Sequence, residues 1–283
     1  MQPRRISILG VGLLGGSIGL ALRSRAKDCQ ITGYGHRKST LDAALQIEAN
    51  DQGYDQLAPA VAGADLVILC TPVGLIRSLL AEIGPLLAPG AIVTDVGSTK
   101  RSIVEAAEQS LPPTAHFVGS HPMAGSEKRG VQYSRADLYD GALCIITPTP
   151  RSNPDALNQV ESFWRLLGMK TCHLSPQEHD RRLADISHLP HALAAALISV
   201  QDDPTLALAG KGFLDVTRIA AGDGALWRDI LIDNRDNVRQ SIAKLQQELE
   251  MLQSLLEPDQ AQMLQAWLDE AAQRREGMRE KNG

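Results

Sequence analysis

The segment Gly10–Gly15 is the feature that most constrains how this 283-residue chain folds. It reads Gly-Val-Gly-Leu-Leu-Gly, follows the apolar run Ile6–Leu9 and precedes a stretch with helical character over Ser17–Ser24. In such a turn the first glycine permits the tight bend, the second admits a pyrophosphate, and the third lets helix and strand pack closely. A tight turn without a ligand is the alternative. We predict a dinucleotide-binding loop whose cofactor contacts are Gly10, Gly12, Leu13, Leu14 and Gly15.

Short apolar runs alternate with helical stretches over the first 175 residues. The predicted strands are Ile6–Leu9, Ile31–Tyr34, Leu66–Cys70, Ile92–Asp95, His116–Gly119, Leu143–Thr147 and Lys170–Leu174. The predicted helices are Ser17–Ser24, Thr40–Gln46, Ile76–Leu87, Ser102–Ser110 and Asp155–Leu167. Because continuous apolar strands separated by helices are typical of parallel sheets covered on both faces, we expect an α/β fold with a doubly wound, mostly parallel sheet.

After Ser175-Pro176 the strand-like runs largely stop. Helical periodicity then covers His191–Val200, Leu226–Leu256 and Asp259–Arg274. With about 150 residues per domain as a guide, we predict a dinucleotide-binding domain over 1–175 and an all-helical domain over 176–283. The last helices carry an apolar stripe, which is either a core-facing surface or a dimer seam: Leu245, Leu249, Leu252 and Leu256.

Charge and cysteine content exclude several function classes. Lys and Arg total 28 against 33 Asp and Glu, a net charge of −5, so we expect neither a nucleic-acid nor a membrane partner. No apolar stretch is long enough to span a bilayer, and the N-terminus lacks a signal-peptide pattern. The cysteines form no CxxC pair and read as buried thiols, which predicts a reducing, cytoplasmic setting: Cys29, Cys70, Cys144 and Cys172.

The end of the second predicted strand bears on the choice of cofactor. Chains that bind NAD usually carry an acid there to hold the ribose hydroxyls, and this chain has Gly35, followed by His36, Arg37 and Lys38. An acid would repel a 2′-phosphate, whereas a guanidinium grips one through two hydrogen bonds. We therefore predict NADP over NAD. A solvated basic loop in a chain that uses NAD is the alternative.

Polar and small residues follow other strands, where ligands of open α/β sheets bind. Cys70, Thr71 and Pro72 end one strand and are assigned to the cofactor, and Asp95–Lys100 ends the next. His121 lies at a third strand end, at the mouth of the predicted cleft. A histidine there is either a hydrogen-bonded core residue or a catalytic one, and the position favours proton exchange with a substrate.

The second half of the chain supplies further candidates. Four histidines fall within nineteen residues, His173, His179, His188 and His191, but no H-E-x-x-H or paired-cysteine spacing accompanies them, so we expect no metal. Arg218 stands among apolar neighbours, and burying it is costly unless it meets an anion. It either pairs with Asp215 or binds a substrate carboxylate.

Taken together, these segments resemble the prephenate/arogenate dehydrogenases of tyrosine biosynthesis. The matching segments are the glycine loop, Asp95–Lys100, Ser120–Gly125, the S-H-L-P-H run Ser187–His191, Phe213–Ile219 and Trp227-Arg228-Asp229. The resemblance implies an N-terminal Rossmann-type domain, a C-terminal helical domain that forms a homodimer, and NAD(P)-dependent oxidative decarboxylation of prephenate to 4-hydroxyphenylpyruvate or of arogenate to tyrosine.

The resemblance also implies residue roles. His121 accepts a hydrogen bond from the ring hydroxyl and acts as general base, which requires a neutral imidazole. Ser98 orients this histidine, and Arg218 binds the substrate carboxylate. Residues that shape the pocket or lie between cofactor and substrate are His188, His191, Asp215, Trp227, His179 and Asp180.

The choice between the two substrates depends on the loop after His121. Arogenate carries an amino group that a buried carboxylate would favour, and relatives selective for arogenate place an acid in this loop. Here Gln132 is neutral, which leans towards prephenate, although Glu127 lies close by. Two other functions stay open: a β-hydroxyacid dehydrogenase of similar architecture and a non-catalytic dinucleotide-sensing module.

Overall fold

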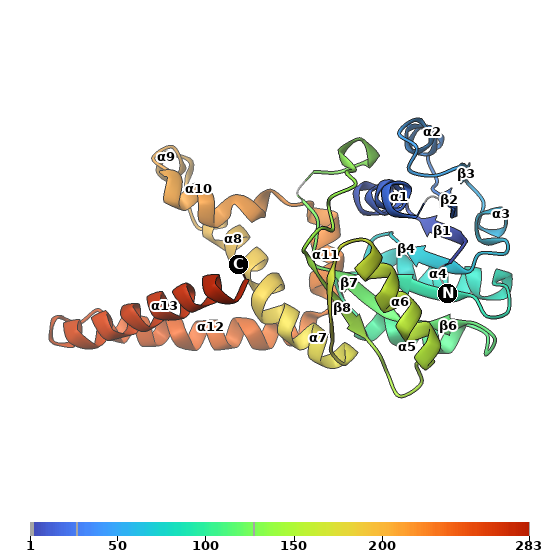
Figure 1. Cartoon of the computed structure of the whole chain (residues 1–283). Coiled ribbons are helices and arrows are strands. Elements are labelled where there is room, and N and C mark those ends of the chain that lie inside the picture. Colours follow the sequence, from blue (N-terminus) through green and yellow to red (C-terminus); the bar gives the residue numbers. More distant parts are fainter. Residues whose placement is uncertain (1–2, 27, 127, 283) are drawn as a thin grey trace. The chain divides into compact units, whose positions relative to one another are not determined.

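The computed structural model describes residues 3–26, 28–126 and 128–282 of the chain (Figure 1). Its contacts divide the chain into two compact units, Met1–Arg235 and Asp236–Gly283. The last strand of the first unit ends at His173, and helices alone follow from Pro176. The division by contacts falls later than the predicted boundary at residue 175, because the helices that follow it pack against the sheet-bearing part. The domain boundary at residue 175 stays a prediction, because a division by contacts does not define a domain.

The first unit is built on a six-stranded sheet in which every pairing is parallel, in the order β3-β2-β1-β4-β5-β6. Its strands are β1 (Arg5–Leu9), β2 (Gln30–Tyr34), β3 (Gln52–Tyr54), β4 (Leu66–Leu69), β5 (Ile92–Asp95) and β6 (His116–Phe117). The order reverses between β1 and β4, which is where ligands of Rossmann-type sheets bind. The predicted doubly wound parallel sheet is confirmed, and β3 was missed because Gln52-Gly53-Tyr54 is not an apolar run.

Helices cover both faces of this sheet, because alternate strand residues point to opposite sides. The helices of this part are α1 (Leu13–Arg25), α2 (Lys38–Gln46), α3 (Leu57–Val61), α4 (Val73–Ile83), α5 (Arg101–Ser110) and α6 (Pro154–Leu166). Ile68 packs in a core with α1, α2 and α6. Its neighbours Val67 and Leu69 pack in a second core with α3, α4 and α5.

A second, three-stranded sheet holds the strand of His121 and was not predicted. The strands are β7 (Gly119–Pro122), β8 (Leu143–Thr147) and β9 (Lys170–His173). β7 and β8 are antiparallel, with His121 opposite Ile145, whereas β8 and β9 are parallel. The predicted strand His116–Gly119 is therefore two strands in different sheets. The chain leaves the large sheet after Phe117, and Val118 still donates to the Val93 carbonyl at 3.0 Å.

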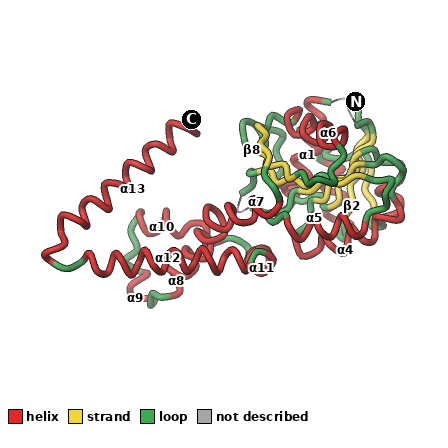
Figure 2. The backbone as a smooth tube through the Cα atoms, turned by 90° about the horizontal axis from the view of Figure 1, so that it is seen from below, coloured by secondary structure: helices red, strands yellow, loops and turns green. Residues whose placement is uncertain are grey.

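Helices make up the rest of the first unit (Figure 2). They are α7 (Pro176–Leu183), α8 (Leu189–Ser199), α9 (Asp203–Leu206), α10 (Lys211–Thr217) and α11 (Gly224–Asp233). A π-helical turn, Ala184–His188, joins α7 to α8. The helical run predicted over Leu226–Leu256 is divided between two helices, Gly224–Asp233 and Arg235–Leu255. It is interrupted at Asn234, whose buried side chain bonds to groups on α7 and the π-helical turn.

The second unit consists of α12, which runs over Arg235–Leu255, and α13 (Ala261–Asn282). In the predicted apolar stripe, Leu249 is 48% exposed and Leu256 65% exposed. The stripe is thus not a core-facing surface along its whole length within one chain. Over the described residues, none of the helices combines the length and the apolar character that crossing a membrane requires.

Candidate active site

The glycine loop leads from β1 into α1, at the point where the strand order reverses. Gly10 has φ of +107°, and a Cβ there would lie 2.7 Å from the carbonyl oxygen of Cys70. A Cβ on Gly15 would collide with the Gly10 carbonyl. Gly12 is different: it caps α1 without a side chain, and a Cβ there would meet nothing within 4 Å. There is therefore no room for a side chain at Gly10 or Gly15, where the backbone packs tightly. At Gly12 the space beside the backbone is empty, as the approach of a phosphate requires.

A cavity of about 510 Å³ opens beside this loop. Ten of the predicted site residues line it: Gly12, Leu13, Leu14, Cys70, Thr71, Pro72, Ser98, His191, Arg218 and Trp227. Its lining also includes five residues of the loop after β7: Ala124, Gly125, Ser126, Lys128 and Arg129. The cavity thus joins the cofactor loop to residues that lie more than 170 positions further along the chain.

The lining fits a nicotinamide dinucleotide on two observations. Gly12 presents open space to the cavity, and the hydroxyl oxygen of Thr71 is buried with no hydrogen-bond partner among the described residues. Because an orphaned buried hydroxyl costs free energy, a ligand atom that pairs with Thr71 is favoured.

The predicted 2′-phosphate residues lie outside this cavity, at the end of β2. His36, Arg37 and Lys38 are exposed, and Arg37 is the N-cap residue of α2. Lys38 already bonds both carboxylate oxygens of Asp42 at 2.8 Å, one helical turn ahead. Arg37 is therefore the stronger candidate of the two cations.

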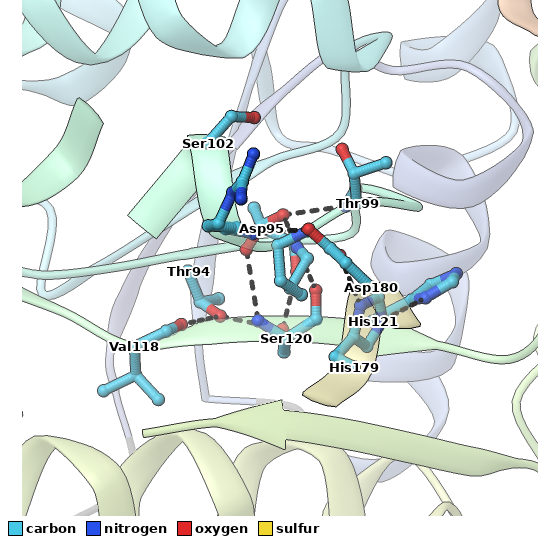
Figure 3. Close-up of polar contacts among 12 residues, drawn as sticks. Thr94, Asp95, Thr99, Ser102, Val118, Ser120, His121, His179 and Asp180 are labelled. Carbon is cyan, nitrogen blue, oxygen red and sulfur yellow. Dashed lines mark hydrogen bonds and ion pairs between the residues drawn. The ribbon is translucent and has the colours of Figure 1, made fainter. Parts of the chain in front are cut away.

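His121 does not line the cavity and is 9% exposed at the end of β7. Its Nδ1 lies 2.9 Å from Nε2 of His179, and Nδ1 of His179 lies 2.8 Å from Oδ1 of Asp180 (Figure 3). The backbone N–H groups of Lys100 and Arg101 donate to Asp180 Oδ1 and Oδ2 at 2.7 and 2.9 Å. Both donors belong to the N-terminus of α5, where partial positive charge favours an anion.

Burial sets the protonation of the histidines. It lowers the pKa of His121 well below the ordinary 6.5, and His179 and Lys100 add to the shift. Burial likewise lowers the pKa of His179 to about 2 and of His188 to about 4. Burial raises the pKa of Asp180. The hydrogen bonds from the backbone N–H groups of Arg101 and Lys100 oppose this rise. His121 is therefore neutral near pH 7, as a general base must be.

Next to His121, around Ser120, lies a buried polar network that the sequence did not reveal. Lys100 forms an ion pair with Asp95, both side chains being fully buried, and also donates to the Ser120 carbonyl at 2.9 Å. The Ser120 hydroxyl donates to the Asp95 carbonyl at 2.6 Å and accepts from the indole N–H of Trp164 at 3.0 Å. Thr94 bonds the same hydroxyl at 2.8 Å (Figure 3). This network connects the ends of β5 and β7, and hence the Ser98 loop and His121.

The other two histidines of the predicted site lie around Trp227. The His191 ring stacks on its indole with ring centroids 3.3 Å apart, and the buried His188 ring meets it edge-on at 6.2 Å. The amide of Asn234 contacts His188 Nδ1 at 3.1 Å, and His188 Nε2 has no hydrogen-bond partner among the described residues. His191 and Trp227 therefore form one wall of the cavity.

Arg218, whose burial would have required an anionic partner, is exposed in the structure, as are Leu214 and Val216 beside it. The apolar neighbours lie on a solvent-facing part of α10, so Arg218 carries no burial cost. Its place in the cavity lining is what keeps it a candidate. Asp215 is exposed and does not line the cavity.

The same holds for Gln132, which lies exposed in the short turn Val131–Tyr133 and outside the cavity lining. Glu127 lies outside the described residues.

Comparison with known proteins decides the family. The profile "Prephenate dehydrogenase, nucleotide-binding domain" matches residues 18–173, and "Prephenate dehydrogenase, dimerization domain" matches residues 175–270. The chain belongs to the prephenate dehydrogenase family.

Relatives within this family match over almost the whole chain. Prephenate dehydrogenase of Bacillus subtilis is 34% identical over 280 residues, which cover 96% of this chain and 76% of the relative. The crystal structure of prephenate dehydrogenase from Aquifex aeolicus, in complex with hydroxyphenyl propionate and NAD+, matches with a TM-score of 0.91 at 33% identity over 98% of both chains. Synechocystis arogenate dehydrogenase matches with a TM-score of 0.84 at 31% identity, over 97% of this chain and 99% of the relative. Membership of this family decides against the β-hydroxyacid dehydrogenase alternative.

Two residues that hydrogen-bond to the candidate residues were not singled out from the sequence, and they are Lys100 and Asn234. Lys100 lay within a quoted segment without a role, and a lone lysine beside the end of an apolar strand gives no sign that it will be buried. Asn234 lay inside an expected helix. Its one signal was that it is a polar residue of low helix propensity between two apolar helical runs.

Proposed function

We propose that this chain oxidatively decarboxylates prephenate to 4-hydroxyphenylpyruvate with NADP, as a step of tyrosine biosynthesis. The observation that carries the proposal is the single cavity that brings the glycine loop and Ser98 together with His191, Arg218 and Trp227. A module that only sensed a dinucleotide would need no such second set of residues. The family relationship supports the same reaction.

In this proposal each side chain has a distinct role. His121, neutral at working pH, accepts the proton of the ring hydroxyl as the carbon–oxygen bond becomes a ketone. Arg218 binds a substrate carboxylate and fixes the ring, and His191 and Trp227 provide a flat apolar wall for it. The nicotinamide, when bound, supplies the hydride acceptor. Loss of CO₂ then produces an aromatic ring. The ring oxygen, which had given up its proton, takes up a proton to become the phenol.

The cofactor preference rests on the loop after β2. Gly35 stands where an acid would hold ribose hydroxyls, and Arg37 is exposed at the N-terminus of α2, where a 2′-phosphate would meet both the guanidinium and helix N–H groups. NAD is the alternative, in which case Arg37 and Lys38 are only a solvated loop.

Prephenate is favoured over arogenate by the charges of the cavity. Its described lining carries the cations Lys128, Arg129 and Arg218, and the one acid in that lining, Asp223, is ion-paired with Arg129. Prephenate is a dianion without an amino group, so this balance suits it better than arogenate, whose ammonium seeks an unpaired carboxylate. Gln132, the residue that favoured prephenate in the sequence, is exposed in the turn Val131–Tyr133 and is not part of this charge balance.

We also propose that residues 176–283 act as a substrate-binding and dimerisation domain in a homodimer. The name of the matching family profile and the exposed side chains of Leu249 and Leu256 support this. The four cysteines are free thiols, which supports the cytoplasmic setting expected from their spacing.

The test is formation of NADPH with prephenate and, separately, with arogenate, together with identification of the product as 4-hydroxyphenylpyruvate or tyrosine. We expect turnover of prephenate to exceed turnover of arogenate. No turnover of either substrate by protein that still binds NADP would overturn the proposal in favour of a dinucleotide-sensing module.

A further inference from the structure

Asp180, His179 and His121 form a continuous hydrogen-bonded chain drawn from two elements. Asp180 and His179 are neighbours on α7, and His121 lies on β7, 58 positions earlier in the sequence. His179 is fully buried, and Asp180 is 4% exposed. The chain runs from the N-terminus of α5, through two side chains, to the ring of the proposed base.

The direction of these hydrogen bonds follows from Asp180. Its two oxygens each accept a backbone N–H, from Lys100 and Arg101 at the start of α5. Two such donors and the positive end of a helix favour the carboxylate anion, which accepts hydrogen bonds only. His179 must therefore carry its proton on Nδ1 and donate it to Asp180, which leaves His179 Nε2 as an acceptor.

The acceptor at His179 Nε2 in turn decides the state of His121. The contact between His179 Nε2 and His121 Nδ1 is a hydrogen bond only if Nδ1 of His121 carries the proton. In a neutral imidazole the lone pair then resides on Nε2. Among the described residues, the one hydrogen bond of the His121 ring is this one at Nδ1.

We propose that Asp180 and His179 are positioning residues that hold His121 in the Nδ1–H tautomer, so that Nε2 is the atom that accepts the proton from the substrate. This rests on the proposed function only in naming His121 as the base. The carboxylate at the far end of the chain also stabilises the positive charge that develops on His121 as the proton arrives.

Asn234 holds the outer end of this arrangement in place. Its side-chain amide donates to the Asp180 backbone carbonyl at 2.7 Å and contacts His188 Nδ1 at 3.1 Å. The interruption between α11 and α12 therefore places this amide against the segment of α7 that carries the positioning residues.

The tautomer is tested directly by nitrogen-15 NMR of the imidazole rings in the full-length protein without substrate, with His121→Asn used to assign the signals. We expect the Nδ1 of His121 to be protonated and Nε2 to be unprotonated at pH 7. Protonation of His121 at Nε2 overturns the proposal. Because no substrate is present, this result is independent of the proposed function, which fails instead if the wild-type protein turns over neither prephenate nor arogenate.

A pair of substitutions at His179 provides the kinetic test. His179→Gln keeps an acceptor oxygen near the position of Nε2, whereas His179→Leu removes it. We expect kcat of the leucine variant to be about 10²-fold or more below that of the wild type. The kcat of the glutamine variant should be at least tenfold higher than that of the leucine variant, and KM for prephenate should change less than kcat in both. Equal kcat values in the two variants would overturn the proposal.

Asp180→Asn and Glu178→Gln make a matched comparison on the same helix. Both replace a carboxylate by an amide, but Glu178 pairs with the exposed side chains of Arg181 and Arg182, away from His121. We expect the Asp180 variant to lose kcat by about 10²-fold or more and to lose the Nδ1–H state of His121, and the Glu178 variant to keep both. A kcat within twofold of wild type in Asp180→Asn would overturn the assignment.

Discussion

The ammonium of Lys100 and the carboxylate of Asp95 form an ion pair in which neither side chain is exposed to solvent. The pair closes the segment that contains Ser98, and Lys100 additionally donates to the carbonyl of Ser120, the residue before His121. In a buried ion pair, the attraction between the two charges offsets the cost of removing each from water. The loss of one partner therefore leaves the other as an unpaired buried charge.

Replacing Lys100 alone should therefore destabilise the fold strongly. We expect Lys100→Met to lower the free energy of unfolding by about 3–5 kcal/mol, measured by urea denaturation. The control is Asp95→Leu/Lys100→Met, which removes both charges and should recover part of the loss. A double variant no more stable than Lys100→Met would show that the loss comes from hydrogen bonds and not from an uncompensated charge, because Lys100 also donates to the Ser120 carbonyl and Asp95 also accepts the backbone N–H groups of Gly97 and Ser120.

Arg37 should set the preference between the two dinucleotides. Charge-assisted hydrogen bonds to a phosphate contribute about 1.5–3 kcal/mol, so Arg37→Ala should raise the Kd for NADP about 10- to 100-fold and leave the Kd for NAD nearly unchanged. Lys38→Ala should have a smaller effect because Lys38 is already paired with Asp42. Equal affinity of the wild-type protein for NAD and NADP, measured by calorimetric titration, would refute the preference.

His121→Asn should separate chemistry from binding. The variant loses the proton acceptor, and we expect kcat to fall by about 10²- to 10⁴-fold. Since His121 does not line the cavity beside the glycine loop, the Kd for NADP should change less than twofold. Fluorescence titration of the cofactor checks this, and a loss of NADP binding would mean that His121 has a structural role.

The local signals in the sequence were sufficient for the glycine turn and for most strands of the parallel sheet. The glycine loop and the apolar strands are read over a few residues, because turn geometry and strand burial are local constraints. The second sheet was missed for the same reason. The run His116–Gly119 has no local mark that divides it between two sheets, because the division depends on the pairing of β6 with β5 and of β7 with β8.

The candidate site shows the same limit more sharply. His121 and His179 were each singled out, but their contact depends on how α7 packs beside β7. The sequence left the burial of Arg218 open, because apolar neighbours such as Leu214 and Val216 do not fix which side of α10 faces solvent. What the sequence could not supply was the set of contacts between distant segments, and those contacts decide which nitrogen of His121 bears the proton.

Arg218 should act on substrate binding more than on the chemical step. In the proposed role its guanidinium binds a substrate carboxylate equally in the ground state and in the transition state of hydride transfer, so Arg218→Ala should raise KM for prephenate about 10- to 100-fold with kcat changed only a few-fold. Arg228→Ala is the matched control, because Arg228 is exposed, pairs with Asp229 and does not line the cavity. An unchanged KM in Arg218→Ala would remove it from the substrate site.

Stability should fall as the pH drops below 6.5. His179 and His188 are fully buried and their folded-state pKa values are lowered to about 2 and about 4, whereas both protonate near 6.5 in the unfolded chain. Between these values the unfolded chain binds more protons, so each histidine stabilises the fold above pH 6.5 and loses that contribution as the pH falls towards its folded-state pKa.

The size of this effect is measurable by urea denaturation at a series of pH values. Each of the two rings contributes at most about 1.4 kcal/mol per pH unit, and the raised pKa of the buried Asp180 acts in the opposite direction by taking up a proton in the folded state. We expect a net loss of stability between pH 6.5 and pH 5, and a smaller slope in His188→Asn. A free energy of unfolding that is constant across this interval would show that these histidines are not held neutral by the fold.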